Sequence, residues 1–318
     1  MRIYPPFIAI LCVVVLACFL GCANPTQNGS LPRSDQAKEY YVPSQGDSLF
    51  VVAIGSGPPI LIVHGGPALN HRYFRPHLDA LADDFTVIYY DQRACGKSSV
   101  NVDNQTMTIA SWVVDMEAIR TYFEIDQWHL LAHSFGALPA INYADRHQDK
   151  LLSFVLVGPS APSSNYRQIE VDELGTRIDD AQALRRVEII SSPSFSNGEM
   201  SALVELMKLN FSNVIFDPAN LDKLNLEFPS DQLRRSEQMS VLQPELDEFD
   251  YEHILPRIKV PSLVLIGSYD PMTLGGGPVY QRALPNNTFS TIEQCGHFPF
   301  VEKPHEFNST LRGFLGSL

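Results

Sequence analysis

The chain has 318 residues, of which 23 are basic and 36 acidic, so its formal net charge at neutral pH is −13. Hydrophobic residues make up 45% and charged residues 19%, a balance that excludes a disordered chain. The excess of acid argues against a nucleic-acid-binding protein, because phosphate contacts need a basic surface. At this length we expect one large domain with a substantial buried core.

The first residues are expected to direct export rather than to join the fold. An uncharged apolar run at 7–20 follows the positive charge of Arg2. It is shorter than the roughly 20 residues of a membrane-spanning helix and is typical of a signal peptide. It leads into the sequence FLGC, which ends at Cys22 and resembles a bacterial lipoprotein cleavage site, while VLAC, which ends at Cys18, is a poorer second candidate. We therefore predict a signal peptide over 1–22, lipidation of Cys22, a polar tether over 23–38, and an exported protein held at the membrane. A plain signal peptide or an uncleaved membrane anchor is the alternative.

From residue 39 onward, strand-like and helix-like segments alternate. The turn Gln45-Gly46-Asp47 predicts a hairpin between strands at 40–42 and 49–54. The continuous apolar run at 60–63 predicts a strand buried on both faces. Further strands are predicted at 86–90, 128–132, 152–157, 262–266 and 288–292. Apolar residues at helical spacing predict helices at 69–81, 108–123, 135–143, 279–284 and 304–314. This alternation indicates a mostly parallel sheet of eight strands with right-handed crossovers.

One long segment interrupts the alternation. It has no strand pattern and is expected to form a helical cap over 159–257, between core segments at 39–158 and 258–318. Residues 160–257 carry 18 acidic and 9 basic side chains, so most of the net charge of the chain lies on this cap.

The strongest chemical signal is the sequence AHSFG at 132–136, between a predicted strand and a predicted helix. This is the setting of a nucleophile elbow, in which a strained turn presents a serine hydroxyl above the sheet. Ala132 and Gly136 supply the small residues that close backbone packing requires. Ser134 is therefore predicted to be a nucleophile, and an ordinary serine helix cap is the alternative.

A nucleophilic serine needs a base, and the base needs an acid that orients it. Asp270 and His297 each follow a predicted strand, so both are expected at the carboxyl edge of the sheet, where Ser134 emerges. The order Ser, Asp, His is the order of this kind of fold. Glu293 ranks below Asp270 as the acid because it is placed within a strand, and His133 is expected to point away from the serine hydroxyl.

A second element, His64-Gly65-Gly66-Pro67, follows the third predicted strand. Acyl transfer creates an oxyanion that needs backbone N–H donors. We predict Gly66 and Phe135 as these donors, with Gly65 as the second choice and a purely structural turn as the alternative. No metal-ligand spacing occurs. Cys95 and Cys295 are expected to be free thiols, and a disulfide between them in an oxidising compartment is the alternative.

Several motifs together resemble the proline iminopeptidases, which are serine exopeptidases of the α/β-hydrolase fold. The motifs are HGGP at 64–67, DQRACGKS at 91–98, the elbow at Ser134, and GHFP at 296–299 with Glu302 and Pro304. The resemblance implies an α/β-hydrolase core with a cap, an acyl-enzyme intermediate, and neither metal nor organic cofactor. The family holds the free amine of its substrate with acidic residues of the cap, and none of these is assigned to a position in this chain.

The expected substrate is a short peptide or small aminoacyl compound with a free N-terminus. The acidic cap agrees with this, because it should attract a cation. A carboxylesterase or other carbonyl hydrolase of the same fold is the alternative, and a non-catalytic ligand receptor is a further one. The sequence does not indicate the oligomeric state.

Overall fold

A computed structural model describes residues 29–32 and 34–318 of the chain. The predicted signal peptide and the lipidation site at Cys22 lie outside the described residues. None of the helices in the described part combines the length and the apolar character that crossing a bilayer requires.

The strands of the described residues form one sheet with the spatial order β1-β2-β4-β3-β5-β6-β7-β8, in which β1 and β2 run antiparallel to their neighbours and the others are parallel. The eight strands are β1 (Ser34–Ser44), β2 (Asp47–Gly55), β3 (Pro59–Val63), β4 (Thr86–Tyr90), β5 (Trp128–His133), β6 (Leu151–Val157), β7 (Ser262–Gly267) and β8 (Asn287–Ile292). The prediction of eight mostly parallel strands is confirmed. The first strand begins at Ser34, so residues 34–38 belong to the sheet rather than to a tether.

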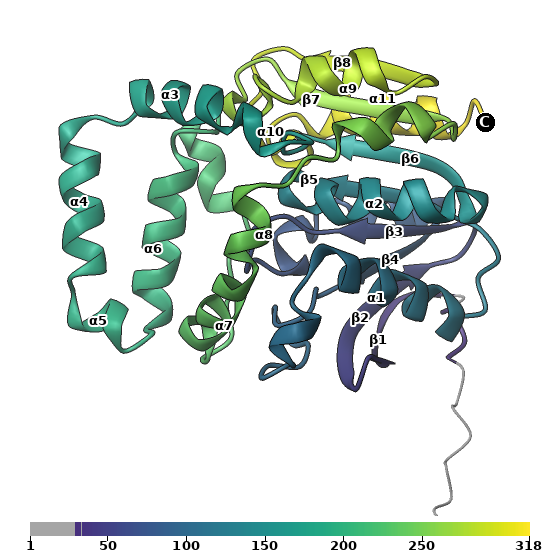
Figure 1. The fold of residues 1–318 in the computed structure, drawn as a ribbon, viewed down its shortest axis with the longest axis horizontal. Helices are drawn as coiled ribbons and strands as arrows, with labels where there is room; N and C mark the ends of the chain where they lie inside the picture. The colour runs from purple at the N-terminus through teal and green to yellow at the C-terminus, as the bar shows by residue number, and fades with distance from the viewer. Residues whose placement is uncertain (1–28, 33) are drawn as a thin grey trace, which may run out of the picture.

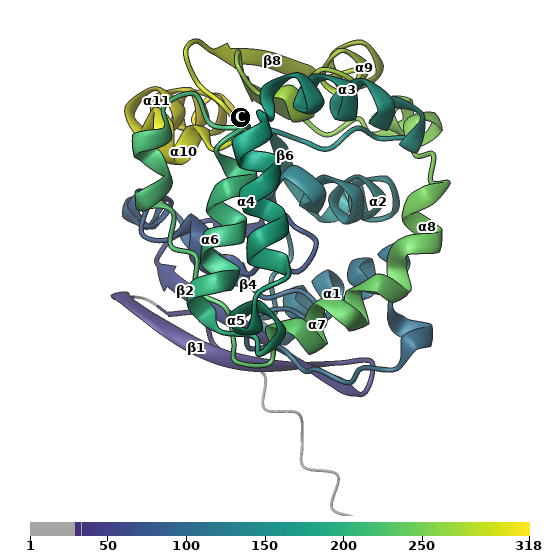
Figure 2. The same ribbon diagram turned by 90° about the vertical axis from the view of Figure 1, so that its left-hand side faces the viewer.

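Helices cover both faces of the sheet, which explains why strands such as β4 are apolar and buried along their whole length. One face packs against α1 (Ile109–Tyr122), α2 (Ala137–His147) and α9 (Gly277–Ala283). The other packs against α10 (Pro299–Glu302) and α11 (Pro304–Leu315). Figure 2 shows α10 and α11 on the opposite side of the sheet from α1 and α2.

The helix predicted over 69–81 is wrong. That segment forms two short 3-10 helices, η1 (His71–Phe74) and η2 (Asp79–Asp83). Pro76 separates them: a proline disfavours helical dihedrals in the residue before it, and Arg75 is extended, with φ −99° and ψ 139°. The remaining 3-10 helices are η3 (Asn104–Thr106), η4 (Ser134–Gly136), η5 (Gln148–Lys150), η6 (Ser164–Tyr166), η7 (Pro218–Lys223), η8 (Ser240–Leu242), η9 (Glu252–Arg257) and η10 (Pro271–Thr273).

The insertion between β6 and β7 is a helical cap, as predicted. Its helices are α3 (Arg167–Arg177), α4 (Asp180–Ile190), α5 (Pro193–Ser196), α6 (Met200–Phe211), α7 (Gln232–Met239) and α8 (Gln243–Asp247). In Figure 1 the cap lies beyond one end of the strands, with α4 and α6 side by side. Ile189 of α4 packs there against Ala202 and Leu206 of α6. The cap therefore covers the edge of the sheet where the predicted site residues lie.

Candidate active site

Ser134 sits in the tight turn between β5 and α2. Its φ of +55° lies in the left-handed region, which costs a non-glycine residue about 1–3 kcal/mol. The turn requires a small residue at position 136, since a Cβ on Gly136 would lie 2.6 Å from the carbonyl oxygen of His64. The strained turn holds the serine side chain over the carboxyl end of the sheet.

The structure brings together the three residues predicted to cooperate. His297 Nε2 lies 2.9 Å from Ser134 Oγ, and His297 Nδ1 lies 2.8 Å from Asp270 Oδ2. The backbone N–H of Met272 donates to the other oxygen of Asp270 at 3.0 Å, so this carboxylate is fixed in place. Because the carboxylate can only accept, Nδ1 carries the hydrogen and Nε2 is left to accept the serine proton.

The charge of Asp270 also acts on the basicity of His297. Burial alone would lower the pKa of the imidazole, but the carboxylate and its hydrogen bond outweigh burial, and the pKa is raised above its ordinary value. Asp270 itself is only 2% exposed. Glu293, the second-choice acid, is exposed just past the end of β8.

The turn His64-Gly65-Gly66-Pro67, called the oxyanion turn below, contains two candidate N–H donors, Gly65 and Gly66. Within the described residues, only one of these N–H groups is already hydrogen-bonded. The N–H of Gly65 donates to the Tyr73 hydroxyl at 2.7 Å, so it is occupied. The N–H of Gly66 donates to no acceptor in the described part of the chain. Gly66 has φ +140°, and a Cβ there would lie 2.8 Å from the nitrogen of Ala68, so only glycine fits. Gly66 and Ser134 line the same cavity.

The HGGP turn is fastened to the DQR segment by reciprocal hydrogen bonds. The backbone N–H of Gln92 donates to His64 Nε2 at 2.9 Å, and the Gln92 side-chain amide donates to the carbonyl of His64 at 2.6 Å. His64 Nδ1 in turn donates to the carbonyl of Gly65 at 2.8 Å. Burial lowers the pKa of His64 to about 4, so the ring is a neutral structural group at physiological pH.

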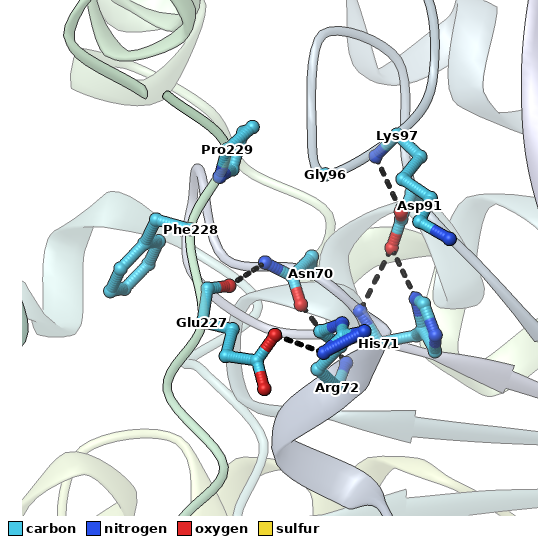
Figure 3. A pocket seen from close by; sticks show the side chains of 9 residues that line it. All are labelled: Asn70, His71, Arg72, Asp91, Gly96, Lys97, Glu227, Phe228 and Pro229. Carbon is cyan, nitrogen blue, oxygen red and sulfur yellow. Dashed lines mark hydrogen bonds and ion pairs between the residues drawn. The ribbon is translucent and has the colours of Figure 1, made fainter. Parts of the chain in front are cut away.

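Asp91 and Arg93 of the DQR segment also have structural roles. Asp91 accepts hydrogen bonds from the backbone N–H and Nδ1 of His71, at 3.0 and 2.7 Å, and from the N–H of Lys97 at 2.7 Å (Figure 3). Arg93 is fully buried and donates to Asp115 at 2.6 Å. The sequence identified this motif only through a resemblance, and the structure shows that it locks the loops behind the site.

A small pocket of about 160 Å³ beside Asp91 marks a junction between core and cap. Figure 3 shows Asn70 donating to the carbonyl of Glu227, at 2.8 Å, while the Glu227 carboxylate pairs with Arg72. Glu227 belongs to the cap, so these contacts hold one of its connecting segments against the core.

Glu302 fixes the loop that carries His297. Its carboxylate accepts hydrogen bonds from the backbone N–H groups of Gly296, Phe298 and Phe216, at 2.7 to 3.2 Å. Because Glu302 belongs to the core and Phe216 lies in the cap, this one carboxylate connects the loop that carries His297 to both the core and the cap. The sequence indicated Glu302 only as part of the resemblance and gave no role for it.

Three cavities lie around the candidate nucleophile: two of them contain Ser134 itself, and the third contains Phe135, the next residue in the chain. One of about 280 Å³ contains Phe135 and Pro67 but not His297. A second, also about 280 Å³, contains Ser134 and His297 and extends along the cap helices. A third of about 220 Å³ also contains Ser134 and His297, and its wall includes the apolar side chains of Leu69, Met207, Phe211 and Phe298.

A carboxylate of the cap faces the first of these cavities. Glu170, on α3, is only 8% exposed, and its Oε1 has no hydrogen-bond partner among the described residues. Burial raises the pKa of Glu170 to about 7, with a further contribution from the charge of Asp270. Sequence reasoning missed this residue, because it is one of 18 acidic residues in the cap with nothing local to distinguish it.

Comparisons with known proteins agree with this architecture. Residues 58–304 match the family described as alpha/beta hydrolase fold. A proline iminopeptidase of Lactobacillus helveticus (strain DPC 4571) is 28% identical over 282 residues, covering 81% of this chain and 90% of the relative. A proline iminopeptidase of Lactobacillus crispatus (strain ST1) is 30% identical over 285 residues, covering 81% and 89%. The crystal structure of proline iminopeptidase from Mycobacterium smegmatis shares the fold, with a TM-score of 0.66 and 22% identity over 88% of this chain and 98% of that one.

Proposed function

The chain belongs to the α/β-hydrolase fold family and is a proline iminopeptidase-like hydrolase, and we propose that it is a serine aminopeptidase that removes the first residue of a short peptide. Its proposed substrates are peptides whose N-terminal amine is free rather than blocked.

In the proposed reaction, Ser134 Oγ attacks the carbonyl carbon of the first residue while His297 Nε2 takes its proton. Asp270 holds the imidazole in the required tautomer and stabilises the imidazolium that forms. The N–H groups of Gly66 and Phe135 stabilise the oxyanion. His297 then donates the proton to the leaving nitrogen, the C–N bond breaks, and an acyl-enzyme remains. Water, activated by the same imidazole, releases the amino acid and restores Ser134.

Glu170 is the observation that carries the aminopeptidase assignment. His297 must protonate the leaving group, so the leaving group lies on the His297 side of Ser134, and the acyl residue lies on the side of Phe135. The cavity on that side contains Glu170, whose Oε1 is buried and unpaired among the described residues. An α-ammonium group would satisfy this oxygen with a charge-assisted hydrogen bond, worth roughly 1.5–3 kcal/mol. A neutral acylated nitrogen would not.

The test compares a prolyl- or alanyl-arylamide with its N-acetyl form. The proposal predicts about 10- to 100-fold higher kcat/KM for the free amine, by the factor of ten per roughly 1.4 kcal/mol. Equal kcat/KM values for the two forms would reject an aminopeptidase.

A carboxylesterase is the second candidate, and the apolar cavity of about 220 Å³ favours it. That cavity adjoins Ser134 and could take a hydrophobic part of an ester. Turnover of aryl esters with no turnover of any aminoacyl-arylamide would select this alternative. Absence of turnover of both aryl esters and aminoacyl-arylamides would favour a non-catalytic ligand receptor.

We also propose that the protein is exported and carries lipid on Cys22, which would hold the domain at a membrane. This proposal rests on the apolar run at 7–20 and the sequence that ends at Cys22.

A further inference from the structure

An arginine without a partner lines the cavity on the His297 side. Arg186 lies on α4 and is exposed, and it makes no ion pair or hydrogen bond with any residue of the described chain. The preceding residue differs: Arg185 pairs with Glu188 at 2.9 Å and with Glu205 at 2.6 Å. Within an acidic cap, a cation left unpaired at the wall of the Ser134 cavity is available for an anion.

A buried acceptor without a donor lines the same cavity. Asn210, on α6, contributes to both cavities that contain Ser134 and His297, and its Oδ1 is buried with no hydrogen-bond partner in the described residues. A buried amide oxygen left unpaired is destabilising, so a ligand N–H there would be favourable. This side of the site therefore offers an acceptor close to the serine and a cation on the same wall.

We propose that this cavity binds the leaving residue and selects peptides with a free α-carboxylate, foremost dipeptides. The inference rests on the proposed aminopeptidase function and adds the second half of the substrate. Asn210 Oδ1 accepts the N–H of the leaving residue, and the guanidinium of Arg186 binds its carboxylate. Arginine suits this role because its planar N–H groups match the two carboxylate oxygens.

The two ends of the site then have opposite charge. Glu170 holds the amine on the acyl side, and Arg186 holds the carboxylate on the leaving side. The adjoining apolar cavity, with Met207 and Phe211 in its wall, accepts the side chain of the leaving residue. A dipeptide with an apolar second residue satisfies all three regions. A longer peptide would place a neutral amide against Arg186.

The experiment compares alanyl-leucine with alanyl-leucinamide, which differ only in the carboxylate. For the wild type we expect kcat/KM about 5- to 10-fold higher for the free acid, the effect of one partly solvated charge-assisted contact. Arg186→Ala should abolish this preference by raising KM for the free acid to the value for the amide. Arg186→Lys should retain part of it. Arg185→Ala is the matched control and should keep the full preference. Added salt should reduce the preference in the wild type.

The outcomes separate this inference from the function on which it rests. Equal kcat/KM for acid and amide in the wild type, or an undiminished preference for the acid in Arg186→Ala, would overturn the carboxylate subsite. If the amide is still cleaved in that case, the proposed aminopeptidase function stands. Failure to cleave either peptide, together with turnover of aryl esters, overturns the aminopeptidase and the subsite together.

Discussion

His133 donates a hydrogen bond from Nε2 to the main-chain carbonyl of His297, at 2.8 Å. Its Nδ1 accepts a hydrogen bond from the Tyr73 hydroxyl, also at 2.8 Å, and that hydroxyl accepts from the N–H of Gly65. Burial lowers the pKa of His133 well below its ordinary value, so the ring stays neutral and can serve both bonds. The oxyanion turn and the loop that carries His297 are thus connected through the residue that precedes the nucleophile.

This connection predicts the effect of Tyr73→Phe. The change leaves the buried N–H of Gly65 and Nδ1 of His133 without partners, which should cost about 1–3 kcal/mol of unfolding free energy. It should also lower kcat, because the position of His297 depends on the same bonds. Urea denaturation and steady-state kinetics measure the two effects. Tyr89→Phe, which removes a partly buried hydrogen bond to Asp79 away from the site, should lower stability alone. An unchanged kcat in Tyr73→Phe would show that these bonds do not position His297.

The proposed nucleophile and acid are tested by direct substitution. Ser134→Ala should lower kcat by roughly 10³-fold or more with the fold intact, since only the oxyanion hole and binding remain. Asp270→Asn should also lose activity because it favours the wrong imidazole tautomer. Glu293→Gln is the control and should behave as wild type. Retention of more than about a tenth of wild-type kcat by Ser134→Ala would refute the assignment.

The pH dependence should differ between substrates with and without an amine. His297 must be neutral to act as a base, and its raised pKa places the loss of activity on acidification above the range of an ordinary histidine. Glu170 must be ionised to bind an ammonium group, and burial raises its pKa to about 7. The kcat/KM of a free-amine arylamide should therefore rise with pH through two ionisations and fall again as the substrate ammonium group loses its proton, whereas that of an aryl ester should rise through one. Profiles of identical shape would contradict the role of Glu170.

Export and lipidation predict the behaviour of Cys22→Ser. Without the cysteine no acyl chains can be attached, and the protein should move from the membrane fraction to the soluble fraction. Cys18→Ser, a change within the same apolar segment, should leave the protein at the membrane. Cell fractionation with immunoblotting measures the distribution. Uncleaved protein that stays at the membrane in Cys22→Ser would indicate a signal anchor instead.

The core was predictable because its signals are local. Strands buried on both faces are continuous apolar runs, so β3 and β4 could be located from composition alone. Ser134 and Asp270 follow such strands, β5 and β7, and His297 follows the more polar and more exposed edge strand β8. These strands are parallel, so their carboxyl ends lie at one edge of the sheet. The helix expected over 69–81 does not form, because Pro76 interrupts the segment despite its apolar residues at helical spacing.

The proposed substrate-binding residues could not be predicted in the same way. Glu170 differs from the other acidic residues of the cap only in being buried in a cavity, and burial there depends on how α3 packs over the sheet. Arg186 and Arg185 are neighbours in sequence, and only the packing of α4 against α6 shows that one is paired and the other is not. Such roles depend on contacts between distant segments, which one sequence does not specify.

The most direct test of the account is the kcat/KM of a prolyl-arylamide and its N-acetyl form in the wild type, Glu170→Gln and Asp172→Asn. Asp172 is an exposed acid on the same helix and serves as the control. We expect a preference for the free amine of about 10- to 100-fold in the wild type and in Asp172→Asn, and its loss in Glu170→Gln through a lower kcat/KM for the free amine. A preference that survives intact in Glu170→Gln, or one that is absent from the wild type, would contradict it.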